Sequence, residues 1–128
     1  MRRIASVLAL VAIAGAGAAP PAGAVTRDNF LTRSTQDLVD LCSAPESDPL
    51  YQAAIGFCLG FAVGAVDTHL AENAGPKGKR LICLPATGLT RKQGVQMFVT
   101  WAKQNPQHMK EPPVDGLYRF LVGRWPCK

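Results

Sequence analysis

At 128 residues the chain is long enough for one small domain, and its apolar content of 48% is enough for a modest core. The formal net charge of +5 is mildly basic, and the lysines and arginines are scattered without interleaved aromatic residues. That pattern argues against a nucleic-acid-binding surface. Four cysteines in so short a chain favour two disulfides over metal or redox chemistry.

The first 24 residues have the pattern of a cleaved signal peptide. Arg2 and Arg3 precede a short apolar run, and an A-x-A cleavage site ends at Ala24. A second such site ends at Ala18, and the apolar run is too short to span a membrane. We expect residues 25–128 to be one exported domain, periplasmic or secreted, that is not embedded in a membrane.

The remaining chain predicts an all-α domain of four helices, because no stretch alternates convincingly between apolar and polar residues. The first helix starts at Ser34, which forms a capping-box-like pair with Asp37, and it stops before Pro45. Its predicted buried positions are Leu38, Leu41 and Cys42.

The second helix is the most apolar, with no charged residue over positions 53–66. We expect Asp48 to be its N-cap and the helix to lie buried at the centre of the domain. Gly56, Gly60 and Gly64 follow one another at four-residue spacing, and each costs about 1 kcal/mol in a helix interior. Two explanations remain open: close packing against another helix of the same chain, or a close contact in a dimer.

A loop over residues 73–80 follows, in which two glycines and a proline exclude regular structure. The third helix has Thr90 as its N-cap, paired with Gln93 in a capping box, and it ends at Asn105. The fourth helix opens at a pair of prolines, of which Pro112 is the first. The predicted buried positions of these two helices are Val95, Phe98, Val99, Ala102, Val114, Leu117, Phe120 and Leu121.

Four cysteines allow three pairings, and the order of the helices favours one of them. Cys42 ends the first helix and Cys58 lies early in the second, so a short connection brings both to the same end of a hairpin. Cys83 precedes the third helix and Cys127 follows the fourth, and those positions also meet in a hairpin. We predict Cys42–Cys58 and Cys83–Cys127 within two helical hairpins. The other pairings would tie the hairpins together and remain open.

The sequence offers no catalytic constellation. Oxidised cysteines cannot act as thiolates, and no serine lies in a G-x-S-x-G elbow. We interpret His69 as part of a solvated helix end, and Glu111 and Asp115 as partners of the dipole of the fourth helix. Asp67 is interpreted as a partly buried carboxylate bonded to a neighbouring loop or helix. We therefore predict that the protein is not an enzyme and needs no cofactor or metal.

The short sequence motifs around the cysteines form an ordered set that extends from Phe30 to Cys127. Leu-Val-Asp-Leu-Cys is followed by Phe-Cys-Leu-Gly-Phe-Ala-Val-Gly-Ala-Val-Asp, then by Ile-Cys-Leu-Pro and a closing Trp-Pro-Cys. Their order and spacing resemble the Rap/Tai family of type VI secretion immunity proteins. The most specific element is Cys-Leu-Gly-aromatic-x-x-Gly-x-x-Asp, here from Cys58 to Asp67.

The resemblance implies a small, exported, disulfide-bonded helical protein, often a dimer, that is an inhibitor. Characterised members bind a peptidoglycan amidase in the periplasm and block its catalytic groove. The resemblance also implies that the motif residues are mostly scaffold. These are the four cysteines, Gly60, Gly64, Asp67 and Pro85.

The family pattern does not specify the toxin-contacting surface, so we place it from exposure and irregularity in the loop 75–80 and the turn 105–111. The candidate contact residues are Lys77, Lys79, Arg80, Gln107 and His108. An alternative function is that of a periplasmic stress or chaperone-like helical protein without a toxin partner. That alternative predicts loose dimers and an exposed apolar surface at low pH.

Overall fold

The computed structural model describes residues 24–128, so the predicted signal peptide before Ala24 lies outside the described residues. The described chain is all-α, as predicted, with one isolated bridge between Ile82 and Pro126 and no strand. The elements in chain order are the short 3-10 helix η1 (Arg27–Leu31), α1 (Thr35–Cys42), α2 (Tyr51–Glu72), α3 (Arg91–Gln104), the 3-10 turn η2 (Pro106–His108) and α4 (Pro113–Arg124).

The capping boxes start two of the helices at the predicted residues. The Ser34 side chain accepts a hydrogen bond from the backbone N–H of Asp37, whose carboxylate accepts one from the N–H of Ser34 in return. Thr90 and Gln93 form the same reciprocal pair at the start of α3. The start predicted for α2 was wrong by two residues, because Leu50 and not Asp48 is its N-cap.

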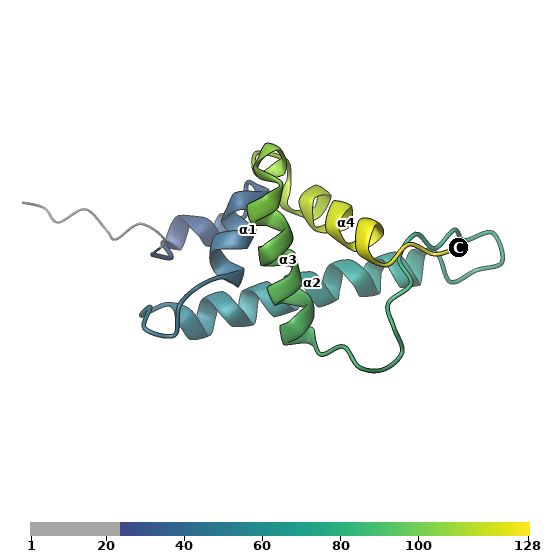
Figure 1. The fold of residues 1–128 in the computed structure, drawn as a ribbon, viewed down its shortest axis with the longest axis horizontal. Coiled ribbons are helices and arrows are strands. Elements are labelled where there is room, and N and C mark those ends of the chain that lie inside the picture. Colours follow the sequence, from purple (N-terminus) through teal and green to yellow (C-terminus); the bar gives the residue numbers. More distant parts are fainter. Residues whose placement is uncertain (1–23) are drawn as a thin grey trace, which may run out of the picture.

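The helices pack around α1, which contacts α2, α3 and α4. In Figure 1, α2 runs along one side of the molecule, with α1 and α4 above it and α3 crossing it. The core between them includes the predicted inner faces of α1 and α3. Its largest fully buried side chains are Phe98, Leu38, Leu41, Ile82, Thr35 and Cys58. One predicted core position, Val114, was wrong: it lies on the outer side of α4 and is 39% exposed.

A glycine lets α4 approach α1 closely. A Cβ atom added to Gly116 would collide with the side chain of Thr35, which is fully buried. The Thr35 hydroxyl lies 3.1 Å from the carbonyl oxygen of Glu111 and 3.0 Å from that of Pro112, and the backbone N–H of Thr35 donates to Glu111 at 2.7 Å. The start of α1 is therefore bonded to the turn that precedes α4.

The prediction that α2 is a buried central helix was wrong. Only Ala54, Cys58 and His69 of its 22 residues are buried. Gly56 and Gly60 are exposed, as is Gly64, and a Cβ added to any of the three would meet nothing within 4 Å. Close packing within the chain therefore does not explain the glycines. Of the described helices, α2 alone is long and apolar enough to cross a membrane, a test that core helices of soluble proteins also pass.

Two disulfides fasten the hairpins in the favoured pairing. Cys42 is bonded to Cys58, with their Cα atoms 5.2 Å apart, and Cys83 is bonded to Cys127, with their Cα atoms 5.0 Å apart. Backbone hydrogen bonds reinforce the second crosslink: the N–H of Cys83 donates to Trp125, and the N–H of Cys127 donates to Leu81. These contacts hold the end of the long α2–α3 connection against the C-terminus of α4.

Candidate functional site

The segment 75–80, here called the basic loop, extends beyond the helices at the end of α2 in Figure 1. All six of its residues are exposed. Its three cations, Lys77, Lys79 and Arg80, form no side-chain hydrogen bond or ion pair within residues 24–128. The basic loop therefore presents a cluster of positive charge to solvent.

Both ends of the basic loop are held by a set of hydrogen bonds that we call the His69 latch. The backbone N–H of Leu81 donates to Nε2 of His69 at 3.0 Å. The Asn73 side chain donates to the carbonyl oxygen of His69 at 2.9 Å and accepts from the N–H of Lys79 at 3.0 Å. A loop joined to its parent helix at both ends loses less conformational entropy when it binds a partner.

His69 is 7% exposed, so its interpretation as part of a solvated helix end was wrong. Its ring lies edge-on to that of Tyr118, with centroids 5.8 Å apart. The Tyr118 hydroxyl donates to the carbonyl oxygen of Ala65 at 2.6 Å, which ties α4 to α2 beside the latch. Burial, and to a lesser degree the charge of Glu72, raises the pKa of Tyr118. The sequence signal for the latch was the Asn four residues after the His, at a helix end.

The turn inside the basic loop is tight. The N–H of Gly78 donates to Gly75 at 2.9 Å, and a Cβ added to Gly78 would collide with the backbone of Asn73. A Cβ added to Gly75 would meet open space. Gly78 is therefore the glycine that the shape of the loop requires.

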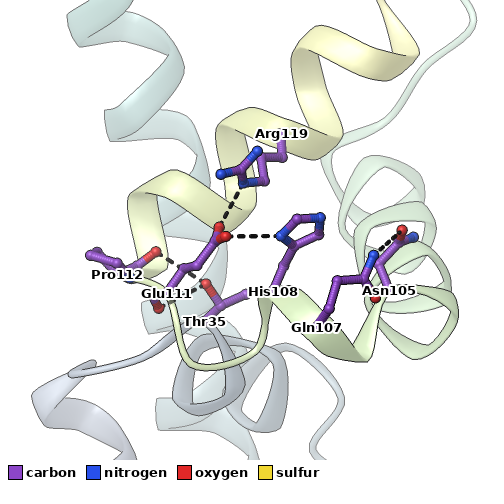
Figure 2. A network of polar contacts seen from close by, with 7 residues as sticks. All are labelled: Thr35, Asn105, Gln107, His108, Glu111, Pro112 and Arg119. Carbon is purple, nitrogen blue, oxygen red and sulfur yellow. Dashed lines mark hydrogen bonds and ion pairs between the residues drawn. The ribbon is translucent and has the colours of Figure 1, made fainter.

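A polar network orders the other candidate segment, the turn 105–111 (Figure 2). The carboxylate of Glu111 lies between two side chains, with Oε2 2.6 Å from Nε of Arg119 and Oε1 2.9 Å from Nδ1 of His108. The hydrogen bond from Arg119, and next that from His108, lowers the pKa of Glu111. Glu111, which we interpreted as a partner of the dipole of the fourth helix, precedes α4, which starts at Pro113.

An aromatic stack also holds this turn in place. The His108 ring lies nearly parallel to the Trp101 ring, at 4° and a centroid distance of 5.8 Å. Gln107 donates to the side chain of Asn105 at 3.3 Å, and both point away from the Glu111 pair in Figure 2. Gln107 is exposed and His108 is half-buried, so both side chains offer atoms to a partner.

One open concave surface, here called the α4 groove, connects the two candidate segments. It is lined by Leu81, which directly follows the basic loop and is 44% exposed, and by His108 of the turn. Its remaining lining residues are Trp101, Asn105, Asp115, Tyr118, Arg119, Val122 and Gly123. Trp, Tyr and Arg are the side chains that most often dominate binding energy in protein interfaces. The basic loop and the α4 groove together form the candidate binding surface.

The motif residues interpreted as scaffold lie outside this surface. Gly60, Gly64 and Pro85 are exposed. Asp67 is also exposed, and its carboxylate forms no hydrogen bond or ion pair with any of residues 24–128, so its interpretation as a partly buried, bonded carboxylate was wrong.

A small disulfide-bonded helical domain with an ordered, cation-bearing loop beside an aromatic groove is a domain built to bind a partner. The sequence model of the Rap1a immunity proteins matches residues 34–127, which include all four helices and all four cysteines. The chain belongs to this family, and the family implies a function in immunity to a toxin. Comparison with curated proteins and with solved structures gives no match.

Proposed function

We propose that the protein is a periplasmic immunity protein that binds a peptidoglycan amidase toxin of a type VI secretion system and blocks its catalytic groove. Family membership supports the immunity role. The sequence motifs around the cysteines resemble those of the Rap/Tai family, and this resemblance supports an amidase as the partner. In this proposal the protein is an exported inhibitor and not an enzyme. Two disulfides suit it to an oxidising compartment.

The observation that carries the proposal is the His69 latch, because it holds a protruding loop in one conformation before any partner arrives. An amidase groove must admit a strand of cell wall, so a narrow, ordered loop can enter it and exclude the substrate. The α4 groove next to Leu81 then contacts the rim of the toxin. Little ordering entropy is lost on binding, which favours the tight affinity that an immunity protein needs.

The three cations of the basic loop serve mainly to accelerate association. Exposed charges contribute modestly to affinity but attract an oppositely charged surface and raise the association rate. This effect is screened over about 8 Å at physiological ionic strength. The proposal therefore requires an acidic rim or groove on the amidase.

We also propose that the outward face of α2 is the contact between two copies of the chain. Ala53, Gly56, Gly60 and Gly64 line this exposed face, which runs without a charge as far as Asp67. The helix α2 is about 33 Å long, and a solvent-exposed apolar face along such a helix is unusual. A second α2 related by a two-fold axis covers it with the same small residues, and glycines allow the two backbones close contact.

Light scattering tests the dimer with two matched substitutions at exposed helix glycines. Gly60→Arg places a charge in the proposed contact, whereas Gly123→Arg places one on α4, and neither new side chain meets a neighbour at its Cβ. The wild type and Gly123→Arg should have the mass of a dimer and Gly60→Arg that of a monomer. A monomeric wild type would exclude the contact.

Inhibition of a panel of candidate periplasmic type VI amidase toxins tests the main proposal. The oxidised protein should stop peptidoglycan hydrolysis at a one-to-one ratio. Gly78→Ala, which distorts the basic loop, should weaken inhibition by at least about tenfold, whereas Gly75→Ala should not. An absence of inhibition by the wild type would refute the amidase role, and equal inhibition by both variants would refute the role of the loop.

A further inference from the structure

A deep apolar cavity of about 220 Å³ lies between α2, α3 and α4 and shares no lining residue with the α4 groove. Its inner end is made by fully buried side chains, including Leu38, Phe98 and the Cys42–Cys58 disulfide. The cavity is partly open to solvent, and most of its lining surface is apolar. An apolar ligand group that enters it therefore removes its own surface and that of the lining side chains from water.

The mouth of the cavity has one charge of each sign. Asp67 on α2 and Arg91 on α3 are its only charged lining residues, and both are exposed. Neither side chain forms a hydrogen bond or an ion pair with any of residues 24–128. Arg91 is the first residue of α3, so the positive end of the helix dipole lies at its backbone.

We propose that this cavity binds a small zwitterion that carries one bulky apolar group, that is, an α-amino acid such as phenylalanine. The apolar side chain fills the cavity, the ammonium group pairs with Asp67, and the carboxylate pairs with Arg91. The size is adequate, because a benzene molecule is taken up by an apolar cavity of about 150 Å³. The Asp67 side chain, which has no partner among residues 24–128 although it belongs to the most specific motif, gains one in this way.

The charges at the mouth favour this ligand over two others. A fatty acid can pair its carboxylate with Arg91 but leaves Asp67 without a partner. An apolar side chain from a second copy would fill the cavity without using either charge. Only a ligand with both charges beside an apolar group matches the whole site.

Calorimetric titration of the oxidised protein tests the site with three ligands of similar shape. Phenylalanine should bind, and 3-phenylpropionate and 2-phenylethylamine, which each lack one charge, should bind about ten- to a hundredfold more weakly. In Asp67→Asn the advantage of phenylalanine over 3-phenylpropionate should disappear, and in Arg91→Gln its advantage over 2-phenylethylamine should disappear. Glu72→Gln and Lys92→Gln remove neighbouring charges that do not line the cavity and should change nothing.

A cavity-filling variant separates binding in the cavity from binding at the surface. Gly94 lines the cavity, and a Cβ added to it meets open space, so Gly94→Leu should fill the cavity without unfolding the helix and should abolish phenylalanine binding. Equal affinity for all three ligands, or unchanged binding in Gly94→Leu, would overturn the proposal. An absence of heat with phenylalanine, together with loss of the dimer in Gly94→Leu, would assign the cavity to a second copy and would also overturn it.

Discussion

Replacement of His69 by phenylalanine tests the latch that holds the basic loop. Phenylalanine keeps an aromatic ring edge-on to Tyr118, so the main loss is the nitrogen that accepts the N–H of Leu81 at 3.0 Å. A partly buried donor left without a partner costs about 1–2 kcal/mol. For a domain of this size that cost corresponds to a fall in melting temperature of about 5–10 °C.

Thermal unfolding and amide hydrogen exchange measure the effect of His69→Phe. The melting temperature should fall by about 5–10 °C, and the Leu81 amide should exchange its hydrogen faster. His108→Phe is the matched control, because it keeps the stack on Trp101 and loses only the solvent-accessible hydrogen bond to Glu111, which contributes little to stability. An unchanged melting temperature and unchanged exchange at Leu81 in His69→Phe would refute the latch.

Three further predictions concern the rest of the fold. Gly116→Ala should destabilise the domain by about 1–3 kcal/mol, because α4 must move away from α1. Gly123→Ala should stabilise it by up to about 1 kcal/mol, because alanine favours the helix more than glycine and its Cβ meets no neighbour. Urea unfolding measures both effects. The pKa of Glu111 is lower in the folded than in the unfolded protein, so its carboxylate stabilises the fold above the unfolded pKa of about 4.3, and this stabilisation is lost as the pH falls through the folded pKa. Glu111→Gln should therefore reduce the unfolding free energy at neutral pH and make it depend less on pH in the acid range, as measured by urea titrations. Replacing Cys83 and Cys127 by serine should cost about 4 kcal/mol of unfolding free energy, as expected for 44 residues of sequence separation.

Local rules predicted the helices and their crosslinks well. Capping boxes fix the starts of α1 and α3, and helical spacing identifies Leu38 and Phe98 as core residues. The order of the helices favoured the observed disulfide pairing, because residues at the same end of a hairpin lie close together. The helix starts and the core positions depend on neighbours in sequence, which a single chain displays directly.

Features that depend on tertiary packing were not predictable in the same way. The apolar run of α2 indicated burial, yet the other helices cover only one side of it and leave Gly60 exposed. Periodicity cannot tell a face covered by the same chain from one covered by another molecule. His69 was missed because its partner, Leu81, is twelve residues away across a loop whose path is not encoded by any local rule.

The affinity of the oxidised protein for a candidate periplasmic amidase toxin, chosen from a panel of type VI effectors, tests the central claim most directly. Titrations should compare the wild type with Lys77→Gln/Lys79→Gln/Arg80→Gln, at low and at physiological salt. The control is Arg27→Gln/Arg33→Gln/Lys92→Gln, which removes the same charge from exposed positions elsewhere. The account predicts a tight one-to-one complex that the loop variant weakens by about tenfold or more at low salt, mainly through slower association, with the control near the wild type. No complex with the wild type, or equal affinity of the two variants, would contradict it.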